Sequence, residues 1–157
     1  KGRPTPMNTV AMLKAVSKQL GIGPAAAMHA AEHLYLQGYL SYPRTESTAY
    51  PPSLEIAELL RQQTRSPVWG DYVSDLLPNN WTRPRTGLDM GDHPPITPCR
   101  YASSSELYGE QGRVYDLVVK HFIATLSPDA VYLQTKVDAM AGNESFSVRG
   151  RQLIRPG

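Results

Sequence analysis

The sequence predicts a mainly α-helical domain with a small antiparallel β part, which is the α+β class. Three observations lead to this prediction. Apolar residues recur with helical spacing in several segments, and glycines and prolines separate these segments. Over residues 131–148 the pattern changes to alternation around a Gly-Asn pair, which is typical of a β-hairpin. Residues 78–105 have no periodicity and are rich in Pro, Gly, Asn and Arg, so we expect a long functional loop there.

The first two predicted helices are separated by a short turn. Asn8 or Thr9 can cap a helix that runs to about Leu20. Two closely spaced glycines end it, and Pro24 suits the start of a second helix that ends at Gly38. With the extended segment that follows as a strand or wing, the pattern favours a helix-turn-helix of the DNA-binding type. A plain helical hairpin fits the same pattern.

Three more helices and a β-hairpin are predicted along the rest of the chain. We expect helices that start at Pro51–Ser53 and end near Arg61, that cover Val68–Leu77, and that run from Glu110 to Leu126 with His121 facing inward. The alternation over Val131–Ala139 predicts a half-buried strand, and a second strand is expected near Phe146–Val148.

The bulk composition excludes several classes of protein. The chain has 157 residues, 41% of them hydrophobic, which suffices for one domain with a core. No apolar run approaches the ~20 residues that cross a bilayer, and no signal-peptide pattern is present, so we expect an intracellular protein without a membrane partner. A single cysteine, Cys99, excludes an internal disulfide. The net charge of +2 favours a few placed cations over a broad basic surface.

The segment Ser41-Tyr42-Pro43-Arg44-Thr45-Glu46 carries the chemistry that the sequence suggests. Pro43 favours extended backbone at Tyr42, where side chains two positions apart project to the same side. A phenolate can attack a phosphodiester while a guanidinium binds the phosphate oxygens through two parallel hydrogen bonds. Tyr42 and Arg44 are therefore candidates for nucleophile and phosphate ligand. Taken alone, so short a motif is more typical of an edge strand with a surface arginine.

Two longer strings make the chemical interpretation specific. The string from Gly38 to Thr48 resembles the active-site segment of the type IA DNA topoisomerases. Within it, Pro43 and Glu46 are similar to the topoisomerase III branch of that family. A second string, Gly91–Pro98, resembles the histidine segment of that branch at the expected distance downstream.

Further strings resemble the eukaryotic beta subtype of topoisomerase III. They are Arg61-Gln62-Gln63 and Asn80–Arg85, and the whole resemblance runs from about Arg3 to Gly157. A tyrosine recombinase is excluded, because its tyrosine follows its other catalytic residues, whereas Tyr42 precedes His93.

The resemblance assigns roles to the residues of the two motifs. It implies that Tyr42 forms a 5′-phosphotyrosine, that Arg44 stabilises the transition state, and that His93 donates a hydrogen bond to the scissile phosphate. Asp92 is expected to orient His93 and to lie at the nucleic-acid interface. The other nucleic-acid-binding candidates are Ser41, Arg83 and Arg85.

Other polar residues are expected to be structural. We expect Glu32 to form a salt bridge, because Leu36 stands where some bacterial relatives have a carboxylate. His29 and His33 are four positions apart, but no cysteine or carboxylate triad accompanies them. We therefore predict no metal site in this chain, and we expect His121 to be structural as well.

The resemblance also implies a domain organisation and partners. Residues 1–130 are expected to form a winged-helix, CAP-like catalytic-tyrosine domain, and residues 131–157 to start the strands that return into an arch domain. The chain opens without a methionine and stops after a strand-like segment, so we expect it to be a piece of a longer polypeptide. The Mg²⁺ of the family lies in a separate TOPRIM domain, and this chain is expected to hold no cofactor. Expected partners are single-stranded DNA, RNA as a second candidate, the TOPRIM and arch domains, and a Tudor-domain protein, in the nucleus and the cytoplasm.

The expected function is cleavage and rejoining of one nucleic-acid strand by transesterification. In the complete enzyme this would give strand passage and relaxation of negative supercoils without ATP, whereas the isolated chain is expected not to relax DNA. The alternative is a noncatalytic winged-helix module that only binds nucleic acid.

Overall fold

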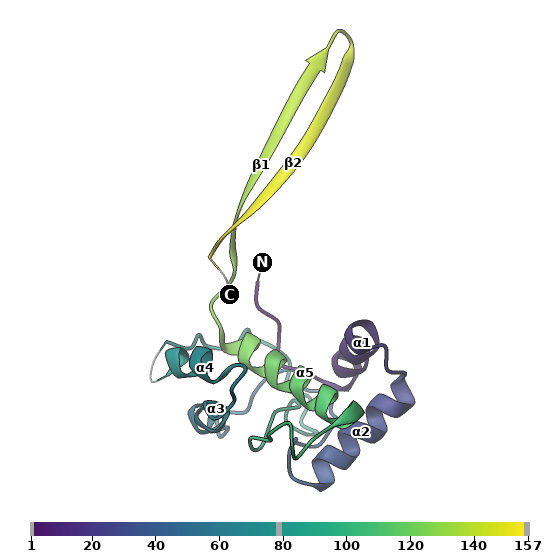
Figure 1. Cartoon of the computed structure of the whole chain (residues 1–157), viewed down its shortest axis with the longest axis vertical. Helices are drawn as coiled ribbons and strands as arrows, with labels where there is room; N and C mark the ends of the chain where they lie inside the picture. Colours follow the sequence, from purple (N-terminus) through teal and green to yellow (C-terminus); the bar gives the residue numbers. More distant parts are fainter. Residues whose placement is uncertain (1, 78–79, 156–157) are drawn as a thin grey trace.

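A computed structural model describes residues 2–77 and 80–155 of the chain. Within these residues, five helices are followed by one two-stranded antiparallel sheet, which confirms the predicted α+β class. The helices are α1 (Thr9–Leu20), α2 (Pro24–Leu36), α3 (Ile56–Gln63), α4 (Gly70–Leu76) and α5 (Gly109–Leu126), and the strands are β1 (Val131–Ala141) and β2 (Glu144–Arg155). In Figure 1, α5 crosses the helical body between the α1–α2 pair and the α3–α4 pair.

The α1–α2 pair begins and ends where its local signals predict. The Asn8 side chain accepts a hydrogen bond from the Ala11 amide at 2.9 Å and caps α1. Gly21 follows with a φ of 69°, a left-handed conformation that glycine adopts without strain. After α2, Gly38 has a φ of 75° and turns the chain toward the predicted active-site segment.

Helices α3 and α4 start later than the sequence predicts. The chain first turns at residues 51–55, where the Leu54 amide donates to the Pro51 carbonyl. Before α4, the Ser66 hydroxyl accepts hydrogen bonds from the amides of Val68 and Trp69, and this local turn replaces the predicted first helical residues. Gly70 then starts the helix, tightly against the Thr64 carbonyl, where a Cβ would lie only 2.3 Å from the oxygen.

Helix α5 supplies the centre of the core. The predicted inward residues Val114, Leu117, Val118 and Phe122 are buried, together with Tyr115, Val119, Ile123 and Leu126, so the buried face is wider than predicted. His121 is partly buried, and one ring nitrogen lies 2.8 Å from the Thr5 carbonyl oxygen. Burial lowers the pKa of His121. No helix within the described ranges is long and apolar enough to cross a membrane.

The predicted loop is paired with the segments that precede α1 and follow α2. From Asn80 to Tyr108 the described chain forms no helix, and its only strand-like pairings are the single bridges Met7–Ile96 and Leu40–Pro98. Residues 78 and 79, the start of the predicted loop, lie outside the described residues. The loop is therefore fixed to the two segments that flank α1 and α2.

The prediction of a half-buried strand is wrong, because both strands of the hairpin are exposed. The β1–β2 hairpin projects from the helical body (Figure 1). Its alternation is real, since Val137 pairs with Val148 on one face, but these side chains are 53% and 64% exposed. Alternation of apolar and polar residues shows that one face of a strand suits packing. No element of the described chain packs on the apolar face of this hairpin. The second strand is also longer than the predicted Phe146–Val148.

Candidate active site

The tyrosine segment, residues 39–48, leaves α2 and runs past the start of α1. Thr9 holds it there. The Thr9 hydroxyl lies 2.7 Å from the Pro43 carbonyl oxygen, and the Thr9 amide donates to the Thr45 carbonyl at 3.0 Å. The Thr45 amide donates back to the Thr9 hydroxyl at 2.8 Å. Only Leu40 forms a strand-like bridge, so the predicted strand or wing at this position is not a regular strand.

The loop of residues 87–98, which contains the histidine motif Gly91–Pro98, is attached along the tyrosine segment by polar contacts. The buried Thr45 hydroxyl donates to the His93 carbonyl at 2.6 Å. The carboxylate of Asp92 accepts from the Glu46 amide and from the Ser47 hydroxyl, each at 2.7 Å. These contacts join two motifs that lie more than forty positions apart in the sequence.

Hydrogen bonds also join the two segments at both ends of their shared boundary. At one end the Thr48 amide donates to the Leu88 carbonyl at 2.8 Å, and the Leu88 amide donates to the Thr48 hydroxyl at 2.9 Å. At the other end the Ser41 hydroxyl donates to the Pro95 carbonyl at 3.2 Å and accepts from the Thr97 amide at 2.8 Å. The two segments therefore form a single polar unit.

Tyr42 lies between two aromatic rings at the centre of this unit. Its ring meets the Tyr35 ring edge-on, with centroids 5.2 Å apart, and the His93 ring at 4.6 Å and 61°. Tyr42 is half-buried, and within the described part of the chain no group hydrogen-bonds its hydroxyl. The ring is thus fixed while the oxygen remains available. The structure brings the predicted nucleophile and the predicted histidine into direct contact.

Arg44 is paired with Glu32 of α2. The Arg44 Nε donates to Glu32 Oε1 at 2.8 Å, and Nη2 lies 2.5 Å from the same oxygen. This confirms the predicted salt bridge of Glu32 and identifies its partner. The Arg44 side chain is 58% exposed, so its remaining N–H groups can reach a ligand in solution.

Asp92 and Ser41 are occupied by contacts within the protein. Hydrogen bonds from the Glu46 amide and the Ser47 hydroxyl hold the pKa of Asp92 well below its usual range. These bonds connect Asp92 to the tyrosine segment, whereas we had expected it to orient the His93 ring. The Ser41 hydroxyl donates its single hydrogen to the Pro95 carbonyl. Both side chains therefore join the two segments, and a contact with nucleic acid would require an exchange of partners.

Arg83 and Arg85 line a groove beside the site. This arginine groove, of about 820 Å³, lies between residues 49–57 and 81–87 and includes Tyr50 and Trp81. Both arginines are exposed, and Arg85 Nη1 donates to the Arg3 carbonyl at 3.1 Å. A hollow of about 230 Å³ at His93 shares Ala49 and Pro51 with the groove, so the two adjoin.

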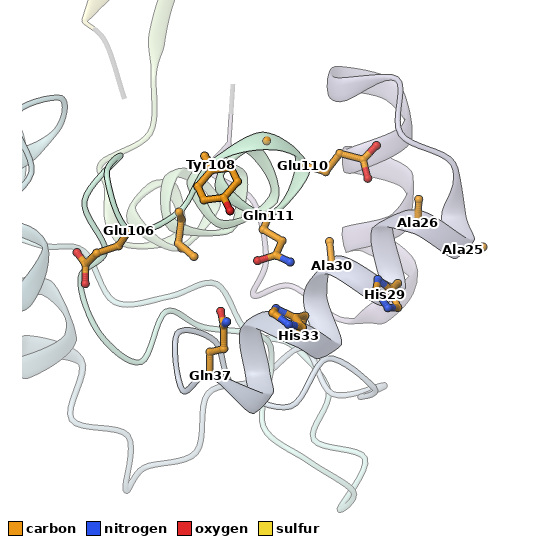
Figure 2. A pocket seen from close by; sticks show the side chains of 12 residues that line it. Ala25, Ala26, His29, Ala30, His33, Gln37, Glu106, Tyr108, Glu110 and Gln111 are labelled. Carbon is orange, nitrogen blue, oxygen red and sulfur yellow. The ribbon is translucent and has the colours of Figure 1, made fainter.

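Another hollow, of about 700 Å³, lies between α2 and the start of α5. Figure 2 shows His29 and His33 on its α2 side, with Glu106 and Glu110 on the side of the α5 start. Among the described residues no group of three or more His, Cys, Asp or Glu side chains is placed to hold a metal ion. The His, Cys, Asp and Glu side chains of the described chain therefore do not form a site for the Mg²⁺ that the resemblance implies for the family.

The residues that hold the two segments together were not predicted from the sequence. Thr9, Thr45 and Ser47 make contacts across 36 to 48 positions of sequence, and no local pattern reveals such partners. Gly87 is also essential to the junction, since a Cβ there would lie 1.9 Å from the Thr48 carbonyl oxygen. Its place within a loop rich in glycine and proline gave only a weak signal.

Comparisons with known proteins agree with the two motifs. A family model described as DNA topoisomerase matches residues 1–157. The chain is 49% identical to DNA topoisomerase 3-beta of Arabidopsis thaliana and 48% identical to DNA topoisomerase 3-beta-1 of Homo sapiens. Each of these matches covers 100% of the chain and 18% of the relative. DNA topoisomerase 3-alpha of Homo sapiens is 37% identical, over 98% of the chain and 15% of the relative.

A solved structure has the same fold. Full-length topoisomerase I from Thermotoga maritima superimposes with a TM-score of 0.72 at 19% identity, over 98% of this chain and 26% of that chain. The chain therefore spans only a small part of the proteins that it matches. From the family match, the high identity along its whole length and the shared fold, the chain belongs to the type IA DNA topoisomerases, in the topoisomerase III group of the beta subtype.

Proposed function

We propose that this chain carries the nucleophile of a type IA topoisomerase active site that cleaves and rejoins one nucleic-acid strand. The observation that supports this most directly is the placement of Tyr42. Its ring is held between Tyr35 and His93, its hydroxyl has no partner in the described chain, and Arg44 follows two residues later.

In the proposed reaction, the Tyr42 oxygen attacks the phosphorus of a phosphodiester. The bond from phosphorus to the 3′ oxygen breaks, and a bond from phosphorus to the tyrosine oxygen forms. The phenol loses its proton, and the departing 3′ oxygen gains one. Because one phosphodiester replaces another, the reverse reaction rejoins the strand without ATP.

Arg44 and His93 would stabilise the charge of the transition state. Arg44 keeps N–H groups free beyond its contact with Glu32, and these can donate to the phosphate oxygens. His93 contacts the Tyr42 ring and is exposed, so its imidazole can donate to the same phosphate. Two donors on one phosphate would suit an attack on phosphorus.

The arginine groove would bind the strand beside the cleaved bond. Arg83 and Arg85 can contact phosphates, and Trp81 offers an aromatic surface for a base. We propose single-stranded DNA as the main substrate, with RNA as a second one, because backbone contacts and base stacking serve both.

The remaining parts of the active site would come from outside this chain. We propose that a TOPRIM domain of the same polypeptide supplies the Mg²⁺ ligands, and that residues 131–157 lead into an arch domain. Residues 1–130 would then be the CAP-like catalytic-tyrosine unit. The complete enzyme would pass strands and relax negative supercoils in the nucleus and cytoplasm, with a Tudor-domain protein as partner, whereas the isolated chain would bind single strands without relaxing DNA.

The test uses the complete topoisomerase polypeptide that we propose this chain to be part of. It is incubated with a single-stranded oligonucleotide labelled at either end, and the reaction is stopped with denaturant. We expect the 3′ label to migrate with the protein and the 5′ label to be released on a shorter fragment. Tyr42→Phe should abolish the adduct, and Tyr108→Phe is the matched control, because Tyr108 is 83% exposed and lies away from the site. Binding without any adduct from the unaltered enzyme would favour the noncatalytic module instead.

A further inference from the structure

We propose that Glu32 and Tyr35 are positioning residues, which orient Arg44 and Tyr42 for cleavage. The inference rests on the proposed function of Tyr42. It concerns two side chains of α2 that lie outside both sequence motifs.

Glu32 occupies one particular edge of the Arg44 guanidinium. A single carboxylate oxygen contacts both Nε and Nη2, at 2.8 and 2.5 Å. This is the side edge of the guanidinium, and no group of the described chain bonds Nη1. The outer edge, formed by Nη1 and Nη2, therefore stays available for two parallel hydrogen bonds to a phosphate. The contact restricts how the guanidinium can turn without blocking its use.

Tyr35 restricts the orientation of the nucleophile, Tyr42. Its ring packs edge-on against Tyr42 at 5.2 Å and 69°. Glu32 and Tyr35 are three positions apart on α2, so they project as neighbours from one face of the helix. One turn of helix thus contacts both reactive side chains.

Buried residues of α2 hold this turn of the helix in place. Ala31 and Leu34, on the adjoining face of the helix, are fully buried in the core. By contrast, the Tyr35 residue is 41% exposed and the Glu32 side chain is 37% exposed, so neither is needed to fill the core. Their contacts with Tyr42 and Arg44 account for their orientation.

The charge of Glu32 gives the inference a distinctive signature. A carboxylate beside a phosphate-binding arginine opposes the approach of nucleic acid, so it does not improve binding. Glu32→Gln keeps the size of the side chain and removes that repulsion. We expect single-strand affinity to be unchanged or higher, while the cleavage rate at saturating oligonucleotide falls about 10-fold or more, since misplacement by 1 Å can cost ~10²-fold. A residue that bound the strand directly would lose affinity instead.

The experiment is a double-mutant cycle in the complete topoisomerase, measured as the single-turnover rate of adduct formation. We expect Glu32→Gln to have no further effect once Arg44→Ala is present, because it acts through Arg44. Tyr35→Leu should slow cleavage in both backgrounds, because it acts through Tyr42. Glu58→Gln is the matched control, since Glu58 pairs with Arg61 on the exposed face of α3 and should leave the rate unchanged.

Two results would overturn the positioning role of Glu32. One is a wild-type cleavage rate in Glu32→Gln, and the other is an undiminished deficit of this variant in the Arg44→Ala background. A wild-type cleavage rate in Tyr35→Leu would remove Tyr35 from the proposal. Absence of an adduct from the unaltered enzyme would refute the proposed function itself, and is distinguishable from all of these.

Discussion

Substitution of Gly87 by alanine should separate the two halves of the site. An added Cβ would lie 1.9 Å from the Thr48 carbonyl oxygen and 2.4 Å from its carbon, and both are backbone atoms that cannot rotate away. Real Cβ atoms essentially never approach closer than 3.0 Å, so the segments must move apart by more than 1 Å. The hydrogen bonds between Thr48 and Leu88, at 2.8 and 2.9 Å, would not survive this shift.

The expected magnitude follows from these contacts. Two lost hydrogen bonds correspond to about 1–3 kcal/mol of stability. A 1 Å displacement of the segment that carries His93 can lower the cleavage rate by ~10²-fold. Gly150→Ala is the matched control, because its added Cβ would meet nothing within 4 Å.

Amide hydrogen exchange at Thr48 and Leu88 is the direct assay. We expect faster exchange at both amides in Gly87→Ala, together with a lower unfolding temperature and slower adduct formation. Unchanged exchange at these two amides would refute the close approach of the segments, and with it our account of how His93 reaches Tyr42.

Three other predictions concern the guanidinium of Arg44, the hydroxyl of Tyr115 in the core, and the two arginines of the arginine groove. Arg44→Lys keeps the charge but loses the planar fork, so cleavage should slow ~10²–10³-fold, and single-turnover rates within twofold of wild type would contradict this. Tyr115→Phe removes a hydroxyl that donates to the Arg100 carbonyl and accepts from the Ala102 amide, which should cost about 1–3 kcal/mol in urea unfolding at pH 9. Burial raises the pKa of Tyr115 to about 12, so the stability that its neutral hydroxyl contributes is complete below the ordinary value near 10 and declines as pH rises to 12. The difference in unfolding free energy between wild type and Tyr115→Phe should therefore shrink over that range. A constant difference would contradict the assignment. Arg83→Ala and Arg85→Ala should each weaken single-strand binding and reduce its salt dependence by about 0.7 in log–log slope, whereas an unchanged slope would remove that arginine from the interface.

Much of the helical architecture could be predicted because its signals are local. Asn8 caps α1, Gly21 ends it and Pro24 begins α2, and each acts within its own turn of the chain. The start of α4 was missed because the Ser66 side chain competes for the amides that a helix would use. The burial of β1 was also wrong, because alternation does not say what covers a strand.

The candidate site was predictable only to the extent that its chemistry is local. Tyr42 and Arg44 are two residues apart, so their spacing alone made them candidates for a shared role, and the histidine motif was recognised from its own string. The contacts that join them could not be inferred. Thr45 reaches the His93 carbonyl across 48 positions, and Glu32, whose salt bridge was expected without a named partner, reaches Arg44 from α2. These depend on the tertiary fold.

The most direct test of the central claim is to identify the residue that carries the cleaved strand. The complete topoisomerase is trapped on a short oligonucleotide, digested with protease and nuclease, and analysed by tandem mass spectrometry. We predict a 5′-nucleotide on Tyr42. Two neighbouring tyrosines are unsuited to this role. Tyr39 is buried under Arg100, and the hydroxyl of Tyr50 contacts Thr125 with a pKa that burial raises. A nucleotide on Tyr39 or Tyr50, with Tyr42 unmodified, would contradict the account.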